Sequence, residues 1–171
     1  SRRARGLLRS VDDEQRAVGR GDDQARAEGD RPGDAWLAEL GVASAFIGRV
    51  GDDVWGRAAV EVLESAGVAV HAAADSSLPT GTCIVLVDAH GERSMVTDSG
   101  ASAVISLGDL PTALFVPGAH LHLSGFSFLH DGAREAALTA LRLAGEQGMT
   151  RSVDPGAMSV VTDVGSERLR G

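Results

Sequence analysis

The sequence lacks several features that whole classes of protein require. It contains no lysine, so all 16 basic residues are arginine, which excludes a Walker-type phosphate loop and Schiff-base chemistry. Its single cysteine, Cys83, excludes an internal disulfide framework and a cysteine-based zinc site, and favours a reducing compartment. No apolar run reaches the roughly 20 residues of a membrane helix, and the net charge of −8 argues against nucleic acid. We therefore expect a soluble cytoplasmic protein that binds neither membranes nor nucleic acid.

The charged residues are distributed unevenly along the 171 residues. Residues 1–34 hold eight arginines and eight acidic residues, and their few apolar residues follow neither a strand nor a helix period. From residue 35 onward, eight arginines stand against sixteen acidic residues, and apolar runs alternate with turn signals. We therefore expect residues 1–34 to be a disordered or non-native leader and residues 35–171 to form the folded part.

The pattern after residue 35 predicts short strands that alternate with helices. Apolar runs predict buried strands at residues 43–50, 68–72, 119–123 and 150–154. One helix is expected to follow Asp53 and to end before Gly67, and another to be capped by Asp131 and to end before Gly148. Strands that alternate with helices of this length indicate βαβ units, so we predict an α/β fold with a mostly parallel sheet.

Two further structural expectations follow from the same pattern. Residues 82–88 and 92–97 flank a turn, which predicts a hairpin that projects from the sheet because it breaks the alternation. Each predicted helix also has an apolar face that we expect to point inward. These faces carry Trp55, Ala59, Val62, Leu63 and Ala66 in the first helix, and Ala137, Leu138, Leu141 and Ala144 in the second.

A series of short motifs resembles one known family. Residues 48–56 read GRVGDDVWG, which is similar to the G-x-V-G-x-D-x-x-G segment of the ribokinase-like (PfkB) carbohydrate kinases. Further segments follow in family order: PTGT at 79–82, GER at 91–93, GAS at 100–102, LHLSG at 121–125 and SVDPG at 152–156. The GAS segment has Ser102 where the family usually has asparagine. The order and spacing over roughly 120 residues make the resemblance specific.

This resemblance implies a fold and an activity. Family members have a parallel sheet flanked by helices with a projecting β-lid, which here would span about residues 68–97. They transfer the γ-phosphoryl group of ATP, with Mg²⁺, to a hydroxymethyl group of a sugar or nucleoside. By position, Cys83, Val85 and Thr97 match lid residues whose side chains face the sugar. Ser124 matches a position at a strand end that contacts substrate in some relatives.

The chain also departs from the family. It has no G-A-G-D motif, whose aspartate takes the hydroxyl proton and whose backbone N–H groups hold the developing negative charge. We therefore expect an inactive fragment without a catalytic residue and without the nucleotide-binding half. In place of the family's Gly-Gly-x-x-Asn loop the chain reads GDRPGD at 29–34. Together with the arginine-only basic complement, this indicates a reading-frame error in GC-rich DNA and a non-native segment before residue 35.

Some of these motifs have a plainer interpretation. Gly48, Gly51 and Gly56, with Asp52 and Asp53, could cradle a phosphate group, but a strand–turn–helix junction also uses glycines and a capping aspartate. We favour the structural interpretation of these five residues. His120 and His122 have a spacing that could bind a metal ion, but no third ligand stands nearby, and we expect ordinary strand histidines.

Two functions other than a sugar kinase are compatible with the residues. The first is a non-catalytic α/β module that binds a small ligand or forms a homodimer through the exposed lid strands. The second is a nucleotide-dependent oxidoreductase, which is disfavoured because no G-x-G-x-x-G follows a first strand. The motifs do not identify the sugar, because sugar choice in the family depends largely on the opening strand and on the Gly-Gly-x-x-Asn loop.

Overall fold

A parallel sheet organises the computed structural model, which describes residues 7–10 and 33–156. Its five strands lie in the order β3-β2-β1-β6-β7, and every neighbouring pair is parallel. The strands are β1 (Leu7–Ser10), β2 (Ser44–Gly51), β3 (Ala69–Asp75), β6 (His120–Ser124) and β7 (Thr150–Asp154). The predicted α/β class with a parallel sheet is confirmed.

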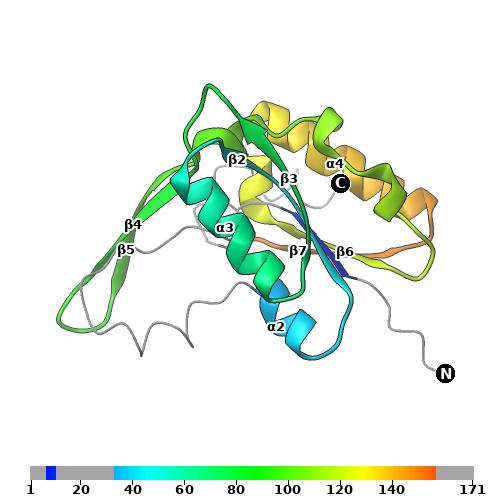
Figure 1. The fold of residues 1–171 in the computed structure, drawn as a ribbon, viewed down its shortest axis with the longest axis horizontal. Coiled ribbons are helices and arrows are strands. Elements are labelled where there is room, and N and C mark those ends of the chain that lie inside the picture. Colours follow the sequence, from blue (N-terminus) through cyan, green and yellow to red (C-terminus); the bar gives the residue numbers. More distant parts are fainter. Residues whose placement is uncertain (1–6, 11–32, 157–171) are drawn as a thin grey trace.

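Helices cover both faces of this sheet (Figure 1). They are α2 (Gly33–Glu39), α3 (Val54–Ser65) and α4 (Asp131–Glu146). Successive side chains of a strand point to opposite faces, and Ala45 of β2 packs in the cluster that contains α4, whereas Phe46 packs with Leu63 of α3. The sheet therefore lies between α4 on one face and α2 with α3 on the other. No helix among the described residues is long and apolar enough to cross a membrane.

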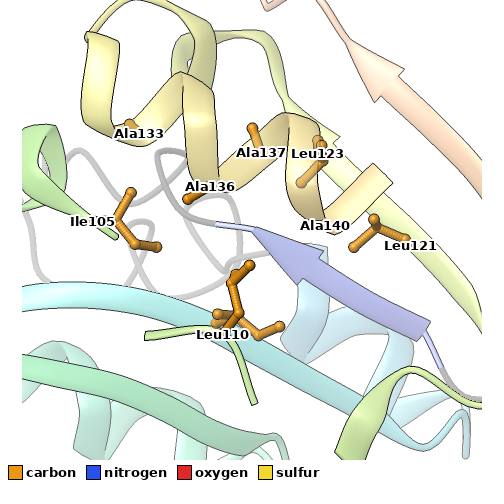
Figure 2. A pocket seen from close by; sticks show the side chains of 9 residues that line it. Ile105, Leu110, Leu121, Leu123, Ala133, Ala136, Ala137 and Ala140 are labelled. Carbon is orange, nitrogen blue, oxygen red and sulfur yellow. The ribbon is translucent and has the colours of Figure 1, made fainter. Parts of the chain in front are cut away.

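The larger part of the core lies between the sheet and α4. Leu121 and Leu123 of β6 are fully buried there, and α4 contributes a face of alanines. A small apolar cavity of about 10 Å³ remains between these groups (Figure 2). Its lining residues are Ile47, Ile105, Leu110, Leu121, Leu123, Ala133, Ala136, Ala137 and Ala140. A space of this size holds at most one water molecule, so it is a packing gap and not a ligand site.

The predicted hairpin is present and forms its own two-stranded sheet. Strands β4 (Thr82–Val87) and β5 (Arg93–Asp98) pair antiparallel and extend away from the body of the molecule (Figure 1). We call residues 82–98 the lid. The expected start of the lid at about residue 68 is wrong, because β3 pairs with β2 and is the edge strand of the main sheet among the described residues.

Several helix positions differ from the expectation. Trp55 and Val62 of α3 are 51% and 45% exposed, because the helix packs on the sheet through the narrow face that carries Gly56 and Leu63. Leu138 of α4 is 49% exposed, since it lies about 100° round the helix from the inward-facing Ala137. The predicted inward orientation of Trp55, Val62 and Leu138 is therefore wrong. A short apolar pattern does not indicate how much of a helix face the sheet covers.

The start of α4 also differs from the expectation. Asp131 is the first residue of the helix, and its N-cap is His130, which makes no side-chain capping hydrogen bond. The Asp131 carboxylate pairs instead with Arg134 at 2.9 Å, one turn further along. A carboxylate in the first turn still faces the positive end of the helix dipole. Asp131 therefore contributes to the helix start by charge and not as the capping residue.

Four residues within the segment 1–34 form a strand. Residues Leu7–Ser10 lie between β2 and β6, with Leu8 in register with both Ala45 and Leu121. The expectation of disorder does not hold for these four residues. Residues 11–32 lie outside the described part of the chain, so the division at residue 34 and the non-native origin of the segment stay predictions.

Candidate functional site

The carboxyl ends of the parallel strands meet at one edge of the sheet. From β1 the chain continues to β2 and β3 on one side, and β6 and β7 follow on the other side. In open parallel sheets, ligands bind outside the carboxyl ends of the strands where the strand order reverses in this way. Ser124 ends β6 at this point; it is 1% exposed, and its Oγ accepts a hydrogen bond of 3.4 Å from the Phe126 N–H. The candidate site is therefore the strand edge around Ser124.

Three of the predicted substrate residues lie together on the lid. Cys83 pairs with Thr97 across β4 and β5, and Val85 pairs with Met95. Residues at alternate positions of a strand share a face, so these four side chains line one face of the lid. Cys83 is buried, Val85 is half-buried, and Thr97 is exposed. Met95 was missed by the sequence argument, although the register of the hairpin places it opposite Val85.

The buried Cys83 thiol gives a direct test of how the base of the lid packs. Its side chain is 1% exposed, and burial raises the pKa of the thiol, so little thiolate is available for reaction. We expect iodoacetamide to alkylate the folded protein on the order of 100-fold more slowly than the urea-unfolded chain. Mass spectrometry reports this directly because the chain has one cysteine. Equal alkylation rates would show that the base of the lid is open.

The glycine-rich turn between β2 and α3 is built around Asp53. Its Oδ1 accepts hydrogen bonds from the Trp55 and Gly56 N–H groups at 3.0 and 2.8 Å, which caps α3. The same carboxylate accepts the Thr80 N–H at 2.8 Å and the Thr80 hydroxyl at 2.7 Å. These donors, with the Thr80 N–H contributing most, lower the pKa of Asp53 from its ordinary value of 3.8 to about 2.

Four backbone amides of this turn, those of Gly51, Asp52, Trp55 and Gly56, donate to protein acceptors. The Gly51 N–H donates to Thr80 Oγ1 at 3.0 Å, and the Asp52 N–H donates to the Asp75 carbonyl at 2.7 Å. The exposed Asp52 carboxylate pairs with Arg57 at 2.8 Å. A phosphate cradle needs several free N–H groups that point at the ligand. The geometry is therefore that of a structural junction, and Gly48 lies before it within β2, in register with Ala72 of β3.

The lowered pKa of Asp53 predicts a particular dependence of stability on pH. Because the folded pKa lies below the unfolded value, ionised Asp53 stabilises the fold above about pH 3.8, and this contribution is lost as the pH falls towards 2. Asp53→Asn removes it, so the stability difference between wild type and variant should shrink as the pH is lowered from 5 to 2.5. Urea unfolding at several pH values measures this. A difference that stays constant over that range would contradict the assignment.

The two strand histidines take part in a ladder of hydrogen bonds with β7. His120 contacts Thr150 Oγ1 through Nδ1 and Ser152 Oγ through Nε2, both at 2.7 Å. His122 Nδ1 contacts the same Ser152 oxygen, also at 2.7 Å. Within the described ranges, no three histidine, cysteine or acidic side chains are grouped so that they could hold a metal ion. The ladder ties β6 to β7 through side chains on one face of the sheet.

An ion-pair network that the sequence argument missed lies beside the turn. Arg49 of β2 pairs with Asp75 at 2.9 Å and with Asp109 at 3.1 Å. These two carboxylates, Asp75 foremost, raise the pKa of Arg49. The pKa of Asp75 is lowered, first by the Ser77 and Leu78 N–H groups and then by Arg49. The network holds the short 3-10 helix around Asp109 against the ends of β2 and β3.

Comparison with known proteins agrees with this geometry. Residues 35–165 match the family described as "pfkB family carbohydrate kinase". The chain belongs to the pfkB family of carbohydrate kinases. Among its relatives, a fructokinase of Klebsiella pneumoniae is 35% identical over 126 residues, which is 72% of this chain and 40% of the relative. Fructokinase-1 of Zea mays is 30% identical over 135 residues, which is 76% of this chain and 42% of the relative.

Solved structures of a fructokinase share the fold of this chain. The apo fructokinase of Vibrio cholerae O395 is 31% identical and superposes with a TM-score of 0.66 over 72% of this chain and 43% of its own. The structure of that fructokinase with fructose, ADP and a calcium ion gives a TM-score of 0.78 at 23% identity, over 98% of this chain and 57% of its own. The fold is therefore ribokinase-like. The chain spans about two fifths of the length of the curated relatives that it matches.

Proposed function

We propose that this chain is the sugar-binding part of a kinase that transfers the γ-phosphoryl group of ATP to a hydroxymethyl group of a sugar or nucleoside. The observation that carries the proposal is the family match over residues 35–165, which includes the lid and the strand edge around Ser124. Several relatives of 30% identity or more are named fructokinase, so a ketohexose such as fructose is the first substrate class to test.

In this proposal the lid and the strand edge enclose the sugar. Cys83, Val85 and Thr97 share the lid face that covers the ring, and the exposed Thr97 hydroxyl is the polar group of the three. From the sheet side the proposed contact is Ser124, at the point where the strand order reverses; it is 1% exposed, so only the edge of its side chain would reach the sugar. Closing a lid over a sugar excludes water, which would otherwise compete for the phosphoryl group.

The proposed reaction also requires a nucleotide. A related fructokinase of Xylella fastidiosa has a structure with bound ATP, and in the proposed reaction ATP would act together with Mg²⁺. The described residues do not fit that group: four amides of the glycine-rich turn donate to protein acceptors, and among the described residues no three histidine, cysteine or acidic side chains are grouped for a metal ion. The sequence also contains no G-A-G-D motif for the proton acceptor and anion hole. We therefore propose that the chain by itself binds sugar but does not phosphorylate it.

Two measurements on the full chain test this function. A coupled assay for ADP release with fructose, glucose, ribose and adenosine should show no turnover, and calorimetric titration with fructose should show saturable binding. A Thr97→Val variant should bind fructose more weakly, whereas Thr112→Val, outside the lid, should bind it like the wild type. Turnover would contradict the inactivity of the chain. Failure to bind any of the four compounds would contradict the sugar-binding role.

One observation favours a second role for the lid as a homodimer contact. Ile84, Leu86 and Val96 share the lid face opposite to Cys83 and are 54%, 58% and 61% exposed. An apolar face on a two-stranded sheet with open edges favours pairing with another copy. Light scattering after size exclusion tests this: Val96→Glu should convert a dimer into a monomer, and Leu40→Glu, in the exposed turn just after α2, should not.

A further inference from the structure

We infer that Asp53 and Thr80 form a clasp that fixes the base of the lid against the end of β2 and the start of α3. Both are positioning residues: they hold the segment from which the lid extends, and they do not touch the sugar. The clasp fixes the position of the lid relative to β2 and α3, and its importance for function rests on the proposed sugar-binding role. The contacts that form the clasp lie within the protein and involve no ligand.

The hydrogen bonds of Thr80 join three parts of the fold. Its N–H and its hydroxyl both donate to the Asp53 carboxylate, and its hydroxyl oxygen accepts the Gly51 N–H. Gly51 ends β2, Asp53 caps α3, and Thr80 lies two residues before β4 begins. A single side chain therefore ties the end of the central sheet, the start of a helix and the first lid strand to one point.

The backbones approach so closely here that side chains cannot be accommodated. A Cβ on Gly51 would collide with the Thr80 backbone nitrogen, and a Cβ on Gly56 would lie 2.8 Å from Thr80 Oγ1. Real Cβ atoms do not approach backbone this closely, so glycine is needed at both positions for the lid base to reach the turn. Gly51 is thereby explained by its contact with residue 80, and Gly56 by its contacts with the Gly51 carbonyl oxygen and Thr80 Oγ1.

The returning end of the lid is held to the same point. The Ala101 N–H donates to the Pro79 carbonyl at 2.8 Å, and a Cβ on Gly81 would lie 2.7 Å from the Ser99 carbonyl oxygen. Gly100 has a φ of 49°, and a side chain there would overlap Pro79. The segments that enter and leave the lid are therefore packed backbone to backbone. The hydrogen bonds that fix Thr80 in place therefore also fix the segments that enter and leave the lid.

The carboxylate of Asp53 is fully engaged in this role. It accepts four hydrogen bonds: Oδ1 accepts those of the Trp55 N–H, the Gly56 N–H and the Thr80 hydroxyl, and Oδ2 accepts that of the Thr80 N–H. A carboxylate acceptor makes stronger hydrogen bonds than a neutral one. Asparagine at position 53 could still cap α3 through its carbonyl oxygen, but its amide group would face the Thr80 N–H, donor against donor. Asp53→Asn should therefore keep the cap of α3 and lose the hydrogen bond to the Thr80 N–H.

Hydrogen exchange of the full chain, followed by mass spectrometry, tests the clasp. In Asp53→Asn and in Thr80→Val, amides of the lid (residues 82–98) should exchange about tenfold faster than in the wild type, while amides of α4 should exchange at unchanged rates. Asp52→Asn is the matched control, because the Asp52 carboxylate is exposed and pairs with Arg57, outside the clasp. Thr80→Ser keeps the hydroxyl and should restore the wild-type lid rates.

Other outcomes would overturn the inference. Equal acceleration in the lid and in α4 would mean that Asp53 contributes only to global stability, and unchanged lid rates would mean that the clasp does not hold the lid. Hydrogen exchange needs no sugar, so a failure of this test is distinct from a failure of the proposed function. If fructose binds, Asp53→Asn should also weaken its binding several-fold, and Asp52→Asn should leave it unchanged.

Discussion

Replacing Leu121 with alanine is expected to lower the free energy of unfolding by about 3–5 kcal/mol. The side chain is fully buried between the sheet and α4, and it borders the small cavity that already exists there (Figure 2). The facing helix presents alanines such as Ala136, Ala137 and Ala140, whose methyl groups cannot reach into a larger space. The new cavity therefore stays open, and the loss lies towards the upper end of the range for such substitutions. Urea unfolding followed by circular dichroism measures it.

Leu138→Ala is the matched control for this substitution. It removes the same atoms from a residue of α4 that is 49% exposed, so the expected change in the free energy of unfolding is below about 1 kcal/mol. If the free energy of unfolding falls by the same amount in both variants, the core does not lie between β6 and α4. If the free energy of unfolding falls less in Leu121→Ala than in Leu138→Ala, Leu121 does not point into the core.

Replacing Gly56 with alanine is expected to destabilise the fold by about 2–3 kcal/mol. In an open helix the same change would stabilise by up to about 1 kcal/mol, because alanine has the higher helix propensity. At Gly56 the added Cβ would collide with the Gly51 carbonyl oxygen and lie 2.8 Å from Thr80 Oγ1. Backbone cannot move there without breaking the hydrogen bonds around Thr80. Thermal and urea unfolding both report the effect.

Gly132→Ala in the first turn of α4 is the control for helix propensity. A Cβ at Gly132 would meet nothing closer than the Ile105 carbonyl oxygen at 3.7 Å, which is ordinary contact. This variant should therefore gain roughly 0.5–1 kcal/mol. A Gly56→Ala variant as stable as the wild type would contradict the close approach of Gly56 to the Gly51 carbonyl oxygen and to Thr80 Oγ1.

Much of the fold could be predicted from local patterns. The runs at 43–50, 119–123 and 150–154 are strands within one or two residues of their predicted bounds, and the hairpin lies where the turn at 89–91 placed it. These features depend on side-chain alternation and on turn residues, which neighbouring residues determine. The order of the motifs indicated the family, and the family match over residues 35–165 confirms it.

Most of the features that sequence reasoning missed depend on partners that are distant along the chain. Asp53 meets Thr80 across 27 residues, and Arg49 meets Asp109 across 60. The exposure of Trp55 and Leu138 depends on how far the sheet extends beneath each helix. The strand at residues 7–10 has no local pattern of its own and is placed by pairing with β2 and β6. No window of neighbouring residues contains these contacts.

The absence of lysine and the single cysteine by themselves excluded several chemistries, and the alternation of strands and helices determined the α/β class. The physical reason is that secondary structure and motif order are read from residues that are neighbours in the chain. Tertiary structure alone decided that the strand order reverses beside Ser124, that β3 belongs to the sheet and not to the lid, and that the glycine-rich turn receives Thr80. These three features depend on packing between segments that are distant in the chain. Close-packed interiors leave no room for extra side-chain atoms at such contacts, so one arrangement is selected.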